Sequence, residues 1–86
     1  MYQAFFSPRT ARAFQDLSLR DAERIRDAVL RLQDNPRGHG TIRLADASIA
    51  QYRRRVGNFR ILFDIDDPQD VVLLLDIRKR DEQTYR

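Results

Sequence analysis

The chain has 86 residues, 42% hydrophobic and 34% charged, which predicts one small globular domain over residues 1–86. It has no cysteine and no apolar run of about 18 residues, which excludes a disulfide framework, thiolate metal sites and a membrane-spanning helix. The net charge is only +3, yet fifteen of the sixteen basic residues are arginine, whose planar guanidinium matches phosphate. The first residues lack the basic and apolar regions of a signal peptide, so we expect a cytoplasmic protein.

The first half of the chain predicts one strand and two helices. Residues 2–7 alternate weakly and are rich in aromatics, which favours a short strand. Ser7-Pro8 is typical of a helix N-terminus, and this first helix should reach about Leu17. Ser18 is the N-cap candidate of a second, amphipathic helix that ends at Asn35-Pro36. The inward residues of the second helix recur at three- and four-residue spacing: Ala22, Ile25, Val29 and Leu32.

The second half of the chain predicts strands joined by turns. Gly57-Asn58 is a two-residue hairpin signal, and a second turn follows Asp66. The expected strands cover 41–45, 51–56, 59–66 and 71–77, and a basic, polar tail covers 78–86. This order predicts a two-layer α+β domain, in which the first strand and the helical hairpin pack on one face of a mainly antiparallel sheet. Two helices cover only one face, so the other is open to solvent or to a partner.

Alternation of side chains along the strands sorts the residues between these two faces. In 59–66 the alternation assigns Arg60 to the open face. In 51–56 it assigns Arg53 and Arg55 to that same face and leaves Arg54 on the helix side, at the sheet edge. The residues of 59–66 that face the core are Phe59, Ile61, Phe63 and Ile65.

The last strand is sorted in the same way. One face takes Val71, Leu73, Leu75 and Ile77. The other face takes Val72, Leu74, Asp76 and Arg78. Arg78 and Arg80 then lie at the margin of the surface formed by the arginines of the hairpin. Like charges on neighbouring strands repel unless an anion lies between them, so this surface is predicted to bind an anion. The alternative is a solvated face that uses arginine for solubility and edge protection.

Residues 52–66, YRRRVGNFRILFDID, resemble the Y-R-x-R-V-G-x-Y-R-x-x-Y pattern of RelE-like toxins of type II toxin–antitoxin systems, in the RelE/ParE superfamily. The remaining elements fit the same family along nearly the whole chain. The resemblance implies a RelE-like microbial RNase fold and a metal-independent mRNA interferase without a cofactor. Such an enzyme cleaves the message in the ribosomal A site through attack by the 2′-hydroxyl. The products carry a 2′,3′-cyclic phosphate and a 5′-hydroxyl.

The resemblance also implies the residues of the site. The predicted catalytic set is Arg55, Arg60, Arg80 and Tyr85. The predicted RNA-binding set is Arg53, Arg55, Arg78 and Lys79. Arg78 competes with Arg80 for the C-terminal basic position. The strand positions that are often lysine in the family are arginine here, and arginine keeps its proton at neutral pH, so it can neither donate nor accept one. The general base is therefore either Tyr85 or a group of the ribosome.

The partners that the resemblance implies are a RelB-like antitoxin, the ribosome with its mRNA, and operator DNA bound through the toxin–antitoxin complex. No membrane partner is expected. Two other functions stay open at this stage. One is inhibition of DNA gyrase by a ParE-like toxin, and the other is a catalytically inactive module that binds an antitoxin or nucleic acid. His39 is the only histidine and carries no metal cluster.

Overall fold

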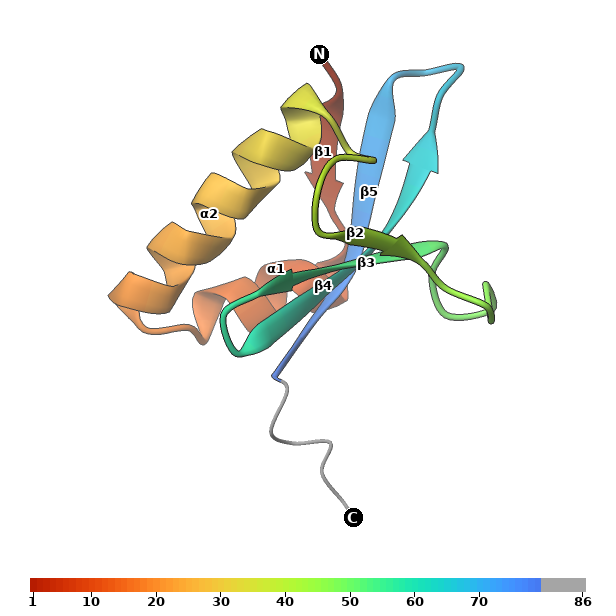
Figure 1. Ribbon diagram of the computed structural model, residues 1–86. Helices are drawn as coiled ribbons and strands as arrows, with labels where there is room; N and C mark the ends of the chain where they lie inside the picture. Colours follow the sequence, from red (N-terminus) through yellow and green to blue (C-terminus); the bar gives the residue numbers. More distant parts are fainter. Residues whose placement is uncertain (80–86) are drawn as a thin grey trace.

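The structure is a computed structural model that describes residues 1–79. Its helices are α1 (Pro8–Gln15) and α2 (Leu19–Asp34). Its strands are β1 (Gln3–Phe6), β2 (Thr41–Arg43), β3 (Tyr52–Val56), β4 (Phe59–Asp66) and β5 (Val71–Lys79). The strands form one sheet in the order β1-β5-β4-β3-β2, in which β1 runs parallel to β5 and all other pairs are antiparallel. The predicted α+β fold with a mainly antiparallel sheet is confirmed (Figure 1).

Both helices begin where their capping residues predict. The Ser7 hydroxyl accepts the Thr10 backbone N–H at 3.1 Å, and the Ser18 hydroxyl accepts that of Asp21 at the same distance. Helix α2 ends one residue before the extended Asn35, as the following proline requires. Helix α1 ends at Gln15, two residues earlier than predicted.

The strand boundaries differ from the predicted ones at three places. Strand β2 stops at Arg43, and β3 starts at Tyr52. Strand β5 continues to Lys79, into the segment that the composition assigned to a tail. The longer β5 matters for the site because it carries Arg78 within the sheet, directly beside β4.

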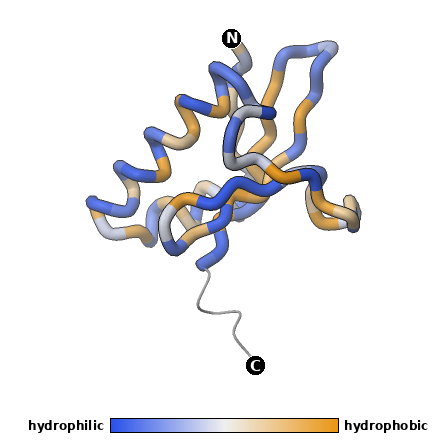
Figure 2. Tube along the Cα trace, in the orientation of Figure 1, coloured by the Kyte–Doolittle hydropathy of each residue, from blue (hydrophilic) through white to orange (hydrophobic). Residues whose placement is uncertain are grey.

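The core lies between α2 and the inner face of the sheet. Ile25 and Leu32 of α2 are fully buried against Ile61 and Phe63 of β4. Tyr52 stacks on Phe63 with ring centroids 5.7 Å apart. Figure 2 shows α2 with its hydrophobic residues toward the sheet and its hydrophilic residues outward. The predicted inward residues of β4 are all buried, as the sequence alternation indicates.

A β-bulge interrupts the alternation of β5. Leu62 lies opposite Asp76, but the next residue of β4, Phe63, lies opposite Leu74, so Leu75 is an extra residue in β5. As a result Val72 and Leu74 point into the core together with Ile77, and they are 0% and 1% exposed. The sequence alternation was therefore wrong in placing Val71, Leu73 and Leu75 on the same face as Ile77.

The bulge is also the point where α1 joins the sheet. A bulge leaves backbone groups without ladder partners, and buried backbone groups need hydrogen bonds. The Ser7 backbone N–H and the Thr10 hydroxyl donate to the Leu74 carbonyl at 2.9 and 2.7 Å, and the Ser7 hydroxyl donates to the Leu75 carbonyl at 3.0 Å. Thr10 is completely buried. The residues that begin α1 thus hold the bulge in place.

Within residues 1–79 no helix is long and apolar enough to cross a bilayer.

Candidate nucleic-acid interface

Three arginines from three strands form a row across the open face of the sheet. Arg55 of β3 lies opposite Arg60 of β4, and Arg60 lies opposite Arg78 of β5. Directly opposed residues have Cβ atoms about 5 Å apart, so the three side chains share one small surface. We call Arg55, Arg60 and Arg78 the basic row. Its formation confirms that the hairpin arginines converge on the open face.

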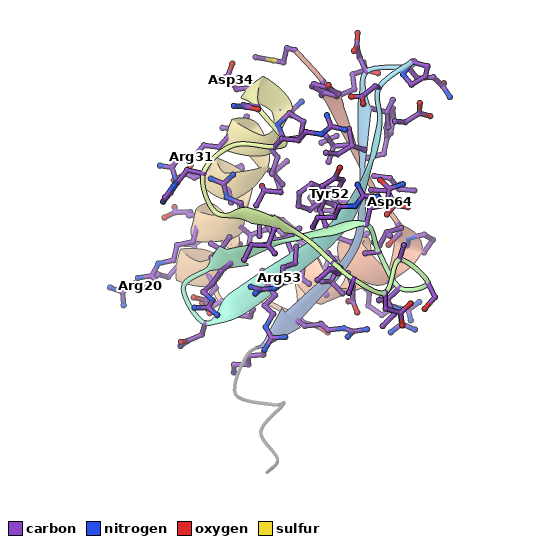
Figure 3. All side chains as sticks on the ribbon, turned by 45° about the vertical axis from the view of Figure 1, so that its right-hand side comes forward. Arg20, Arg31, Asp34, Tyr52, Arg53 and Asp64 are labelled. Atoms are coloured by element: carbon purple, nitrogen blue, oxygen red, sulfur yellow. The ribbon has the colours of Figure 1, made fainter. Side chains whose placement is uncertain are left out.

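Arg53 lies next to the basic row, one step further along β3. Its partner across the sheet is Leu62, and the partner of Leu62 on β5 is Asp76. Figure 3 shows Arg53 and its neighbour Tyr52 leaving β3 in opposite directions, Tyr52 toward the helix side. The predicted RNA-binding position of Arg53 therefore adjoins the row.

The Arg60 guanidinium contains a polar atom whose hydrogen bond is missing. Its Nε is buried and has no hydrogen-bond partner within residues 1–79. A buried donor without a partner costs about 1–3 kcal/mol, so such atoms in folded proteins need an explanation. Arg60 thus lies at the centre of the row with a buried guanidinium nitrogen that no group of residues 1–79 satisfies.

Asp76 is a residue of this surface that the sequence reasoning did not select. Its side chain is only 13% exposed; Oδ2 accepts a hydrogen bond from Arg78 Nε at 3.0 Å and lies 3.9 Å from Arg9 Nη1. Its Oδ1 accepts the backbone N–H of Ile77 at 2.8 Å. The carboxylate thus fixes the direction of the Arg78 guanidinium. The Asp-x-Arg spacing, which puts both residues on one face of a strand, is the signal that could have identified it.

Another predicted site residue, Lys79 of β5, is not in the row. Lys79 lies opposite the buried Phe59, so strand alternation directs it to the helix side rather than to the row. Arg80 and Tyr85 lie outside the described residues.

Arg54 occupies the helix side of β3, as predicted. The α2–β2 loop encloses it: a Cβ on Gly40, which has a φ of 96°, would lie 3.3 Å from the Arg54 Nε. Burial lowers the Arg54 pKa, and the nearby positive charge of Arg31 lowers it further. Arg54 is therefore a structural neighbour of the loop and takes no part in the basic row.

The opposite end of the open face is apolar and acidic. A shallow cavity of about 520 Å³ lies there, beside the β4–β5 turn. Phe5 and Leu73 supply exposed apolar surface, and three carboxylates line the same cavity: Asp64, Asp66 and Asp67. The open face is therefore divided into a cationic end and an anionic end.

A hydrogen-bond network at the anionic end connects the N-terminal segment, the α2–β2 loop and the β4–β5 turn. Arg37 of the α2–β2 loop binds both carboxylate oxygens of Asp67, at 3.1 and 2.9 Å, and the Tyr2 hydroxyl donates to Oδ1 at 2.7 Å. These hydrogen bonds, first that of Arg37 and then that of Tyr2, lower the Asp67 pKa. The hydrogen bond to Asp67 raises the pKa of Tyr2. Asp67 is thus held in its charged form by its partners.

The fold is shared with solved structures of RelE toxins. RelE in the RelE–RelB complex from Pyrococcus horikoshii OT3 superposes with a TM-score of 0.79 at 20% identity, covering 92% of this chain and 94% of that one. The toxin–antitoxin complex RelBE2 from Mycobacterium tuberculosis gives 0.81 at 22% identity, covering 92% and 98%. The isolated toxin RelE from E. coli gives 0.78 at 17% identity, covering 92% and 84%.

A match to a known protein family covers most of the sequence. Residues 5–84 match the family described as the ParE toxin of the type II toxin–antitoxin system parDE. The chain therefore belongs to the ParE toxin family, and it is a type II toxin of the RelE/ParE superfamily. No curated protein gives a sequence match. The resemblance read from the hairpin motif is confirmed at the level of the superfamily.

Proposed function

We propose that this toxin is a ribosome-dependent endonuclease that cleaves mRNA in the A site. One observation carries the proposal: the basic row presents three arginines together, and the Arg60 Nε at its centre lacks a hydrogen-bond acceptor within residues 1–79. RNA supplies negatively charged oxygens at regular spacing, and arginine binds them with paired N–H groups. A gyrase inhibitor that does not cut RNA has no need of this row.

The proposed reaction is an internal displacement at phosphorus. The ribose 2′-oxygen attacks the adjacent phosphodiester, the bond to the 5′-oxygen breaks, and a 2′,3′-cyclic phosphate and a 5′-hydroxyl remain. Negative charge builds up on the phosphoryl oxygens in the transition state. Each preorganised hydrogen-bond donor there increases the reaction rate by a factor of about 10²–10³. Arg55, Arg60 and Arg78 supply these donors, and the reaction requires no metal or organic cofactor.

The reaction also needs a proton to leave the 2′-hydroxyl and one to reach the 5′-oxygen. The arginines of the row keep their protons at neutral pH and serve neither purpose. We assign proton transfer to Tyr85 or to a group of the ribosome, and a second leaving-side contact to Arg80. Dependence on the ribosome follows from this division of labour.

The proposal includes an antitoxin of the RelB type. Two of the solved structures that share the fold are toxin–antitoxin complexes, and the family itself is defined by such a pair. The antitoxin would neutralise the toxin in the cytoplasm, and the complex would bind operator DNA.

Inhibition of DNA gyrase is the second candidate function. It is favoured by the family match, because that family is named for the ParE toxin and the match covers residues 5–84. The two candidate functions differ in whether they need the basic row. The nuclease requires it, and gyrase inhibition does not.

Primer-extension mapping of a translated message tests the proposal, with and without ribosomes. The variants are Arg60→Ala and, as a matched control, Arg20→Ala, an exposed arginine at the start of α2 whose side chain extends away from the sheet (Figure 3). We expect cuts only with ribosomes, a loss of at least about 100-fold in Arg60→Ala, and wild-type cutting in the control. Absence of cuts from folded toxin, together with inhibition of gyrase supercoiling, would reject the nuclease and support the second candidate.

A further inference from the structure

A small pocket adjoins the basic row on the open face. It has a volume of about 230 Å³ and lies between the start of α1, the 46–50 loop and the outer face of β4 and β5. Its lining residues are Arg9, Ile49, Leu62, Leu75, Asp76 and Arg78. The pocket therefore combines three aliphatic side chains with two guanidinium groups and one carboxylate.

This combination suits a flat, partly polar ring. Leu62, only 5% exposed, and the half-buried Leu75 offer an apolar surface, and Ile49 from the loop is exposed beside them. The Arg78 guanidinium, held by Asp76, offers a second planar surface. Unpaired bases of RNA are bound in this way, by stacking on apolar side chains or guanidinium planes while their edges form hydrogen bonds.

Asp76 supplies the group that can distinguish one base edge from another. Each of its oxygens accepts one hydrogen bond, from Ile77 N–H and from Arg78 Nε, and each retains a second lone pair. A carboxylate accepts hydrogen bonds and donates none. It therefore favours a base with an exocyclic amino group, such as cytosine, and repels the carbonyl oxygen that uracil presents at the same position.

The pocket and the row are spaced for one nucleotide. Arg78 belongs to both, and Leu62 follows Arg60 on the same face of β4, two residues or about 7 Å further along the strand. We propose that the pocket is a subsite for one unpaired, amino-bearing base next to a phosphate on the basic row, with Asp76 as its specificity-determining residue. The role of this subsite in cleavage rests on the proposed function, but its binding preference does not.

Titration of the purified toxin with cytidine 5′-monophosphate and uridine 5′-monophosphate, followed by NMR, tests the subsite directly. We expect cytidine monophosphate to bind about fivefold tighter, as one hydrogen bond of about 1 kcal/mol predicts. Asp76→Asn should remove this preference, because an amide both donates and accepts. Asp66→Asn, at the other end of the open face, should retain it.

Ile49→Ala provides a second variant, since this exposed residue lines the pocket and carries no fold contacts in the buried core. The substitution should weaken the binding of both nucleotides equally and leave the ratio of their affinities unchanged. Equal binding of the two nucleotides by the wild-type toxin, or an unchanged preference in folded Asp76→Asn, would overturn the subsite.

Cleavage mapping of the same variants separates this inference from the proposed function. A cytidine preference in binding without any RNA cleavage would reject the nuclease and leave the subsite standing. Cleavage whose sequence context is the same in the wild type and in Asp76→Asn would reject the subsite and leave the nuclease standing.

Discussion

The two ends of the open sheet face share strands β4 and β5 but differ in charge. The hairpin end carries the basic row, whereas the end beside the β4–β5 turn carries Asp64 and Asp66 next to exposed Phe5 and Leu73. The chain has a net charge of only +3, so composition alone does not predict a surface for a polyanion. Segregation of charge along β4 and β5 concentrates the arginines at the hairpin end and the carboxylates at the other end.

The bulge at Leu75 is the boundary between the two ends. On the turn side of the bulge, Val72 and Leu74 of β5 face the core, and on the hairpin side Ile77 does. The inward residues are thus even-numbered before the bulge and odd-numbered after it. The even-numbered Asp76 and Arg78 can therefore face outward although Val72 and Leu74 face inward. With Leu75 retained, a strictly alternating β5 could not place Val72, Leu74 and Ile77 in the core and also Arg78 in the basic row.

The largest effect is expected from deletion of Leu75. Removal of the extra residue leaves Val72, Leu74 and Ile77 inward, but it removes the backbone carbonyl that accepts the Ser7 hydroxyl and the bulge beside which α1 begins. A buried polar group that loses its partner costs about 1–3 kcal/mol, a large part of the stability of a domain of this size. We expect the deletion variant to be destabilised by about this amount, as measured by urea unfolding monitored by circular dichroism.

Leu75→Ala is the matched control because it keeps the length of β5 and removes only a half-buried side chain. It should fold with a smaller loss of stability. Equal unfolding midpoints for the deletion and the control would show that the hydrogen bonds between the start of α1 and the bulge do not stabilise the fold.

The second prediction concerns energetic coupling along the basic row. If Arg60 and Arg78 bind one phosphate, their alanine substitutions will be non-additive in the binding of single-stranded RNA, with a coupling energy of about 0.5–3 kcal/mol. Arg60→Ala combined with Asp66→Asn should be additive within about 0.5 kcal/mol, since about 20 Å of β4 separates the two residues. Fluorescence anisotropy on the full double-mutant cycles measures both quantities, and additivity in the arginine pair would count against a shared phosphate.

A smaller effect is expected in the salt dependence of RNA binding. Each phosphate contact on a single strand contributes about 0.7 to the slope of log affinity against log salt concentration. Arg53→Gln should therefore flatten the slope by about this amount, whereas Arg26→Gln, on the solvated side of α2, should leave it unchanged. Equal slopes for the two variants would remove Arg53 from the interface.

The smallest effect lies at the anionic end and depends on pH. The hydrogen bonds from Arg37 and Tyr2 lower the Asp67 pKa in the folded state, so the folded state is stabilised at pH values above the unfolded pKa of about 3.9. This contribution disappears as the pH falls through the lower, folded pKa. Asp67→Asn should have a slightly lower urea midpoint than wild type at pH 6, and the difference should shrink as the pH falls through the lowered, folded pKa of Asp67.

RNA binding supplies the control for this last prediction. Asp67→Asn should bind RNA as the wild type does at pH 6, because the Asp67 network lies at the end of the face away from the row. A difference in unfolding midpoint that grows on acidification would contradict the assigned direction of the pKa shift.

Local sequence patterns predicted most of the fold. The serine caps located both helix starts, and strict alternation in 59–66 assigned the buried residues of β4, because these features depend only on neighbours in the chain. The faces of β5 could not be predicted, since the bulge exists through hydrogen bonds from Ser7 and Thr10, more than sixty residues away.

The sequence also predicted where two arginines of the basic row lie, whereas their roles stay predictions. The hairpin motif identified Arg55 and Arg60, whose pairing follows from the two-residue turn at Gly57. Asp76 was missed because its importance comes from a contact with Arg78 and proximity to Arg9, which requires α1 to dock beside the bulge. Roles for Arg80 and Tyr85 stay predictions.

The most direct test of the division between the cationic and anionic ends is an NMR titration of the toxin with a short single-stranded RNA. A 2′-deoxy substitution in this RNA prevents its cleavage. We predict amide shifts at residues 53–55, 60–62 and 76–79, and none in the lining of the acidic cavity at 64–67 or 71–73. Shifts concentrated in 64–67 and 71–73, with none along the basic row, would contradict the account.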